Sequence, residues 1–303
     1  MAELQTVTDA RQALGPTGVW LGALAREPAA NQRAAVARIE QLGYGSLWEG
    51  EGVGRNDIFA QEAVWLGATS RIVAGAGIAN IWARHPATAR AAAAALADAW
   101  PGRFVLGLGV SHAPMVDRTG QTYQRPLERM REYLDGMDGA PDAPPATAPR
   151  VLAALRPRML TLARDRTDGA HTYFVPPEHT AQARAVLGPD RLLIPEQAVV
   201  VEASPAVARE TARRHTAGYL ALPNYVNNLK RLGFTDEDVA GAGSDHLVDS
   251  IVAWGEPAQI VQRLHAHREA GADHVLIQPL GADVKDALGQ LEELAPLLTG
   301  PAH

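Results

Sequence analysis

Two loops that follow short apolar segments carry the strongest candidates for catalysis. His112 comes directly after the run FVLGLGVS, and His171 and Thr172 end the segment GAHT. Imidazole titrates near neutral pH, so a histidine at such a position can donate or accept a proton during a reaction. We therefore predict His112 as the general acid or base. The alternative is a loop histidine whose ring only closes a hydrogen bond near the start of a helix.

Acidic and aromatic residues end another short apolar segment, SLWE, at residues 46–49. Glu49 and Glu51 are the second candidates for the proton partner, because carboxylates also serve as general acids and bases. Trp48 is predicted to form a wall of the substrate pocket. The alternative is that Trp48 packs beneath the preceding loop while both acids face solvent.

A third loop, NIWARH at residues 80–85, is crowded with polar and aromatic side chains. Asn80 and Trp82 are expected to line the pocket. Arg84 and His85 are expected to position the start of the helix that follows, at Pro86.

Two further segments offer groups for ligand binding. Arg156 stands at the predicted start of a helix, where free N–H groups and a cation together favour an anion such as phosphate. Surface salt bridges are the alternative for this arginine. Tyr225 and Asn227 lie in the run PNYVNN, which is interpreted either as part of a lid over the substrate or as an ordinary capped turn.

The elements that must position these loops follow one another regularly. Residues 72–112 read as strand, loop, helix, strand and loop, which makes a right-handed βαβ unit of a parallel sheet. This alternation continues until eight strands are reached, and the predicted strands include residues 19–24, 46–49, 72–79 and 192–201. Short helices are inserted at about 218–250 before the last unit, and a final helix is predicted over residues 284–298. We predict an α/β fold, a (β/α)8 TIM-type barrel, as a single domain over residues 1–303. Its strands would end at one mouth and gather the candidate loops there.

The composition is that of a globular enzyme. Apolar residues make up 47% of the chain and charged residues 20%, which supports a large core and argues against disorder. A net charge of −6 without a run of Lys or Arg gives no electrostatic footprint for nucleic acid. The first fifteen residues lack the apolar segment of a secretory signal, and no apolar run is long enough to cross a membrane. We therefore expect a cytoplasmic protein that acts on a small molecule.

Several kinds of chemistry are excluded or disfavoured. The absence of cysteine excludes disulfides, thiolate metal sites and a cysteine nucleophile. The histidines do not cluster at metal-ligand spacing, so no metal is expected. GAGIAN and GLGVSH both lack the third glycine of a dinucleotide-binding fingerprint, and the P-loop, HExxH and GxSxG motifs do not occur.

The run GIANIWARHPATARAAAAALADAWPGRFVLGLGVSH closely resembles the luciferase-like monooxygenase superfamily. The resemblance extends over the whole chain through WLGAL, SLWEGEG, TDGAH and GADHVLIQPL. The segment EGxGRxxxF at residues 51–59, together with LPNYVNNL, is similar to the branch that uses the deazaflavin coenzyme F420.

The resemblance implies roles for particular residues. In the family, the bulge of the third strand contains a cis peptide bond behind the tricyclic ring, and Gly77–Ile78 is the matching bond here. Ala79 and Asn80 would then contact the ring edge, and the segment Ala154, Leu155 and Arg156 matches a phosphate loop. Ser111, His171 and Thr172 would bind polar groups of the cofactor or the substrate. His112 stands where some relatives carry a glutamate acid.

The expected reaction is hydride transfer between C5 of F420 and a small organic substrate, with His112 as proton partner. The resemblance also implies a homodimer. Two alternatives stay open: an FMN-dependent monooxygenase that works with a separate reductase, and a flavin-binding barrel without catalytic activity. Oxygen consumption separates the first alternative from the F420 enzyme, because reduced FMN reacts readily with oxygen and a deazaflavin does not.

Overall fold

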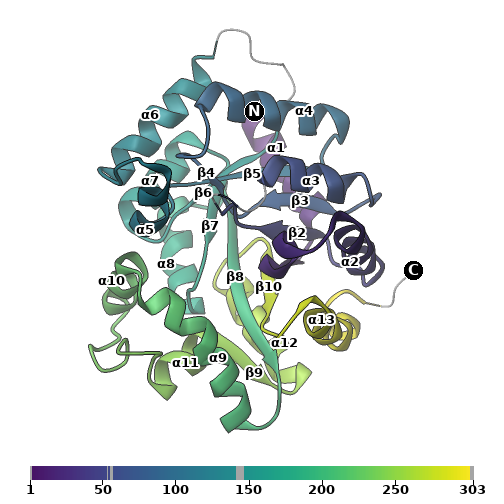
Figure 1. Cartoon of the computed structure of the whole chain (residues 1–303), viewed down its shortest axis with the longest axis vertical. Coiled ribbons are helices and arrows are strands. Elements are labelled where there is room, and N and C mark those ends of the chain that lie inside the picture. Colours follow the sequence, from purple (N-terminus) through teal and green to yellow (C-terminus); the bar gives the residue numbers. More distant parts are fainter. Residues whose placement is uncertain (1, 53, 55–56, 141–146, 301–303) are drawn as a thin grey trace.

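Eight parallel strands close into a barrel in the computed structural model, which describes residues 2–52, 54, 57–140 and 147–300. The closure is made by β10, which pairs with both β1 and β8. This confirms the predicted (β/α)8 fold (Figure 1). The barrel strands are β1 (Thr17–Trp20), β2 (Ser46–Glu49), β3 (Val73–Ala76), β5 (Phe104–Gly109), β6 (Arg150–Ala153), β7 (Gly169–Thr172), β8 (Leu192–Val201) and β10 (Val275–Pro279).

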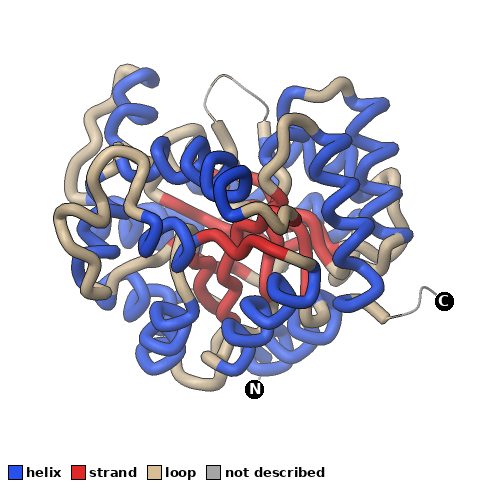
Figure 2. Tube along the Cα trace, turned by 90° about the horizontal axis from the view of Figure 1, so that it is seen from below, coloured by secondary structure: helices blue, strands red, loops and turns tan. Residues whose placement is uncertain are grey.

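Helices surround the strands on all sides (Figure 2). Many of them begin with proline in the first turn, where the missing N–H costs nothing. Asp57 caps α3 by accepting the backbone N–H of Ala60. The surrounding helices are α2 (Ala29–Gln41), α3 (Ile58–Leu66), α4 (Pro86–Ala99), α6 (Pro126–Asp138), α7 (Pro157–Arg166), α8 (Pro177–Leu187), α9 (Pro205–Leu220), α12 (Pro257–Glu269) and α13 (Val284–Leu298).

The barrel interior is a packed core rather than a channel. Trp48, Val105, Val151 and Ile194 belong to one buried cluster inside the strands. A helix that the sequence patterns did not predict, α1 (Ala2–Leu14), contributes its buried Leu14 to the same cluster. The interior is thus filled below the mouth, so ligands must bind at the mouth itself.

Two predicted strands differ from the structure. A strand was predicted over residues 19–24, but the chain leaves β1 after Trp20 and forms the 3-10 turn η1 (Gly22–Arg26), which carries Leu24 into the core. The strand predicted over residues 72–79 is interrupted by the cis peptide bond Gly77–Ile78, as the family resemblance implies. Beyond that bond the chain resumes as β4 (Ala79–Asn80), which pairs with β5.

The segment at 218–250 contains the end of α9 and the two helices α10 (Pro223–Arg231) and α11 (Asp245–Ile251). Directly after α11 the chain forms the strand β9 (Val252–Gly255), which pairs with the end of β8 outside the barrel. The segment shares a second core with Phe174, in the loop after β7. It therefore forms one side of the mouth.

Two further points concern the described part of the chain. No helix in the described part of the chain is long and apolar enough to span a membrane. Of the EGxGRxxxF segment, positions 53, 55 and 56 lie outside the described residues.

Candidate active site

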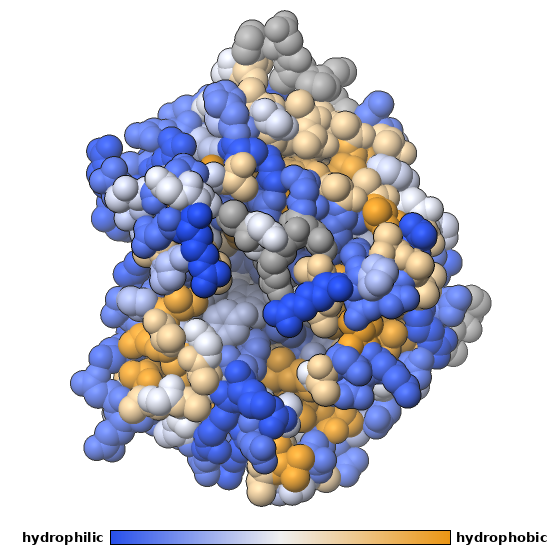
Figure 3. Space-filling model, in the orientation of Figure 1, coloured by the Kyte–Doolittle hydropathy of each residue, from blue (hydrophilic) through white to orange (hydrophobic). Residues whose placement is uncertain are grey.

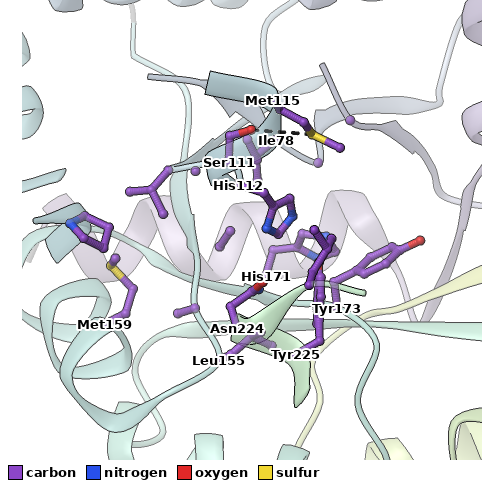
Figure 4. A pocket seen from close by; sticks show the side chains of 18 of the residues that line it. Ile78, Ser111, His112, Met115, Leu155, Met159, His171, Tyr173, Asn224 and Tyr225 are labelled. Atoms are coloured by element: carbon purple, nitrogen blue, oxygen red, sulfur yellow. Dashed lines mark hydrogen bonds between the residues drawn. The ribbon is translucent and has the colours of Figure 1, made fainter. Parts of the chain in front are cut away.

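A pocket of about 280 Å³ opens at the carboxyl ends of the strands. The face shown in Figure 3 is hollowed near its centre, and Figure 4 shows the pocket from close by. Such a volume lies near the lower end of the range for drug-sized ligands, roughly 300–1,000 Å³. The structure brings most of the predicted residues to its wall: Glu51, Gly77, Ile78, Ser111, His112, Ala154, Leu155, Arg156, His171 and Tyr225.

Two predicted residues of β2 lie elsewhere. The indole of Trp48 points into the barrel interior, where its Nε1 donates to Ser46 Oγ at 2.9 Å. Glu49 is buried on the opposite side of the strand and accepts a hydrogen bond from Gln61 at 2.6 Å. Neither side chain lines the pocket. Adjacent residues of a strand point to opposite faces, so Trp48 enters the barrel interior and Glu49 points toward Gln61 on α3.

The remaining predicted residues support the pocket or lie away from it. Asn80 is buried, and its side-chain oxygen accepts the N–H of Trp82 at 3.0 Å. Trp82 in turn donates from Nε1 to the carbonyl of Val110. Ala79 and Thr172 are buried next to lining residues, whereas Asn227 is exposed on α10.

Sequence reasoning found only part of an aromatic wall, which we define as Trp20, Tyr173, Tyr219 and Tyr225: Tyr225 was predicted, whereas Trp20 and Tyr219 were missed. Tyr173 lies 5.3 Å from the Trp20 ring and 5.2 Å from the Tyr219 ring, measured between centroids. Its hydroxyl is within 2.7 Å of the Tyr219 hydroxyl. Trp20 is the last residue of β1, so the strand-end rule could have found it.

His112 projects into the middle of the pocket (Figure 4). Its ring lies 5.4 Å from the ring of Tyr225, and its side chain is hydrogen-bonded to that of Asn224. Burial lowers the pKa of His112, and the bond to Asn224 opposes that shift. The imidazole is therefore mostly neutral at pH 7 and can accept a proton.

Replacing Asn224 by alanine should lower the pKa of His112 further, because the hydrogen bond that favours its charged form is lost. The pKa can be measured by NMR titration of the imidazole C–H signals. Asn227→Ala is the matched control, since Asn227 is exposed on the same helix. Equal titration curves for Asn224→Ala and the unmodified protein would contradict this geometry.

Glu51 holds the bulge just after the cis bond. Its backbone N–H donates to the carbonyl of Ile78 at 3.0 Å, and its Oε2 accepts the N–H of Asn80 at 2.8 Å. Both carboxylate oxygens also pair with the guanidinium of Arg84, which bonds Asp57 as well. The side chains of Glu51 and Arg84 are only 4% and 12% exposed. This engagement favours a positioning role for Glu51 over proton transfer.

His171 and Trp20 present polar atoms without partners. His171 Nδ1 lies 2.8 Å from the carbonyl of Ile194, and because a carbonyl only accepts, Nδ1 carries the hydrogen. Its Nε2 is therefore an acceptor, and within the described residues it has no partner. Trp20 Nε1, a donor, is likewise buried without a partner there. His171 Nε2 is thus an unused hydrogen-bond acceptor, and Trp20 Nε1 an unused donor, beside the pocket.

The fold and site define a barrel enzyme with a small-molecule pocket at the mouth. A sequence profile of the luciferase-like monooxygenase family matches residues 6–274, and the chain belongs to this family.

Two curated relatives resemble the chain over different lengths. A Mycobacterium tuberculosis protein named "Putative coenzyme F420-dependent oxidoreductase" is 34% identical over 119 residues, which span 39% of this chain and 34% of that protein. The 5,10-methylenetetrahydromethanopterin reductase of Archaeoglobus fulgidus is 25% identical over 313 residues, covering 87% of this chain and 94% of the reductase.

Solved structures share the fold. The coenzyme F420-dependent tetrahydromethanopterin reductase of Methanopyrus kandleri aligns with a TM-score of 0.77 at 17% identity, over 93% of this chain and 99% of that one. The oxygenating constituent of 3,6-diketocamphane monooxygenase from Pseudomonas putida, solved with FMN, aligns at 0.70 and 15% identity, over 95% and 99%.

Proposed function

We propose that this enzyme is an F420-dependent oxidoreductase that transfers a hydride between C5 of the deazaflavin and a small organic substrate. The observation that carries the proposal is the similarity along 87% of this chain to the Archaeoglobus fulgidus reductase, taken with the shared fold of the Methanopyrus kandleri tetrahydromethanopterin reductase, which is named as coenzyme F420-dependent. The similarity to the Mycobacterium tuberculosis protein supports the same cofactor over a shorter segment.

The pocket residues fit such a cofactor. A heterocyclic ring edge that has both a carbonyl and an N–H would satisfy the donor Trp20 Nε1 and the acceptor His171 Nε2, which lack partners in the described structure. Gly109 lets Ile78 of the bulge lie close, because a Cβ at residue 109 would come within 2.3 Å of the Ile78 side chain. Arg156 lines the pocket at the uncapped start of α7, and it would hold a phosphate group there.

The chain's own residues supply positioning and proton transfer. When bound, coenzyme F420 supplies two-electron chemistry by taking up or releasing a hydride at C5. His112 would accept the proton that a substrate hydroxyl loses as its carbon is oxidised, at the imidazole nitrogen not bonded to Asn224. The aromatic wall would exclude water and hold the substrate near the ring.

The pH dependence of turnover follows from this role. If neutral His112 is the base, kcat/KM for substrate oxidation should fall as the pH drops through the pKa of His112. Burial places that pKa below 6.5, so the acid limb should have its midpoint below pH 6.5. A midpoint above that value, or an acid limb that survives in His112→Gln, would contradict the assignment.

Turnover assays test the function directly. Oxidised F420 is offered with small alcohols and reduced F420 with small carbonyl compounds, while cofactor absorbance and dissolved oxygen are followed together. We expect absorbance changes without oxygen uptake. Oxygen uptake when a reductase supplies reduced FMN would instead favour the monooxygenase.

We further propose that the protein is a homodimer, as the family resemblance implies, and that it is cytoplasmic. Sedimentation equilibrium should give twice the mass of one chain, and a single-chain mass would reject the dimer.

A further inference from the structure

Glu196 is a carboxylic acid buried under the pocket, and the chemistry above does not use it. It lies in β8, opposite Leu276 of β10, and is 1% exposed. Its Oε2 accepts the backbone N–H of Phe174 at 3.1 Å. Its other oxygen, Oε1, has no hydrogen-bond partner among the described residues.

The backbone at Phe174 needs such support. Phe174 has a φ of +58°, in the left-handed region that a bulky residue rarely adopts because its Cβ approaches the following carbonyl oxygen. Its ring stacks on Tyr219 at 5.0 Å and meets Tyr225 edge-on at 5.5 Å. The preceding residue, Tyr173, donates to Gln278 at 2.7 Å. The conformation of this loop therefore sets three members of the aromatic wall.

We propose that Glu196 is a positioning residue for the pocket: its neutral carboxyl group holds the Phe174 N–H and thereby fixes Tyr173, Tyr219 and Tyr225. Ionisation of the carboxyl group would place an uncompensated negative charge beneath the wall and loosen it.

Among the described residues, no cationic side chain offsets the burial of Glu196. The titratable side chains that interact electrostatically with Glu196 are Tyr173, directly after β7, and Tyr225 on α10. The histidines of β7 and α9 are His171 and His215. The arginines of α9, which are Arg209, Arg213 and Arg214, pair with Asp245, Asp249 or Glu210 instead. Burial lowers the pKa values of His171 and His215 to about 4, so both rings are neutral. Burial likewise raises the pKa of Glu196 to about 8, and the bond from Phe174 only partly offsets that.

The sign of the pH effect follows. The folded protein keeps the Glu196 proton up to about pH 8, whereas the unfolded chain loses it near the ordinary glutamate value of about 4.5. The folded state therefore binds more protons within this window, and stability falls as the pH rises from about 4.5 to 8. Below the window the carboxyl group is neutral in both states.

Glu196→Gln and Glu196→Leu test the proposal, with Glu202→Gln, just beyond the end of β8, as the matched control. The glutamine variant keeps an acceptor for Phe174 and cannot ionise, so its melting temperature should exceed that of the unmodified protein at pH 9, with the difference growing from pH 5 to 8. The leucine variant removes the acceptor at every pH. Glu202→Gln should follow the unmodified protein.

Binding of F420 gives the second readout, and only this one rests on the proposed function. The unmodified protein should bind F420 about tenfold more weakly at pH 9 than at pH 6.5, because ionisation places a buried charge beneath the aromatic wall that the Phe174 N–H only partly offsets. Glu196→Gln should bind equally at both pH values, and Glu196→Leu weakly at both. If Glu196→Gln keeps the pH dependence of the unmodified protein in both readouts, the proposal is overturned. If the unmodified protein binds no F420 at pH 6.5, the proposed function fails, and the melting temperatures still decide the role of Glu196.

Discussion

Replacing His112 by alanine should lower kcat by about 10²- to 10⁴-fold, the usual contribution of a general acid or base. The affinity for F420 should change little, because the ring is expected to rest on the bulge and the strand ends rather than on this imidazole. Steady-state kinetics and a binding titration on the same preparation measure both quantities.

His85→Ala is the matched control for this variant. His85 accepts the N–H of Ala87 at the start of α4 and does not line the pocket, so its loss should leave kcat unchanged. A His112→Ala enzyme that keeps normal kcat would remove His112 from the reaction. If the unmodified protein binds F420 tightly but turns over nothing, a non-catalytic barrel becomes the better interpretation.

Replacing Glu51 by glutamine should lower the free energy of unfolding by about 3 kcal/mol, which is typical of breaking a buried ion pair from one side. The change leaves Arg84 largely buried with only Asp57 as its anionic partner, and it removes the charged acceptor of the Asn80 N–H. The same loss should loosen the bulge and weaken cofactor binding. Urea unfolding and an F420 titration measure the two effects.

Asp57→Asn provides the comparison for Glu51→Gln. Asp57 pairs with the same guanidinium but its side chain is 54% exposed, and asparagine caps a helix as well as aspartate does. Its loss should therefore cost less than about 1 kcal/mol. Equal effects of the two variants would show that Glu51 does not clamp the bulge.

Strand and helix patterns predicted the barrel because each element carries its own signal. The bounds predicted for β2, β8 and α13 agree with the structure. Since parallel strands end at one edge, the loops holding His112, Arg156 and His171 meet at the same pocket without any long-range information.

The individual side chains were harder to place. Strand alternation, applied strictly from Ser46, would have sent Trp48 inward and Glu49 outward. In PNYVNN the side that faces the pocket depends on where α10 begins and how it docks, which is why Asn224 lines the pocket while Asn227, three residues on, is exposed. The burial of Glu196 depends on the packing of β7, α9 and α10 over it, which no local pattern contains.

The most direct measurement of the central claim is a titration of the purified protein with F420 and, separately, FMN, followed by tryptophan fluorescence. Trp20 lines the pocket, so Trp20→Phe should remove most of the change, whereas Trp254→Phe, in β9, should not. We predict micromolar or tighter binding of F420 and much weaker binding of FMN. Tighter binding of FMN than of F420 would contradict the F420 assignment and favour the monooxygenase. If the protein bound neither cofactor, it would share only its fold and family with the F420-dependent enzymes.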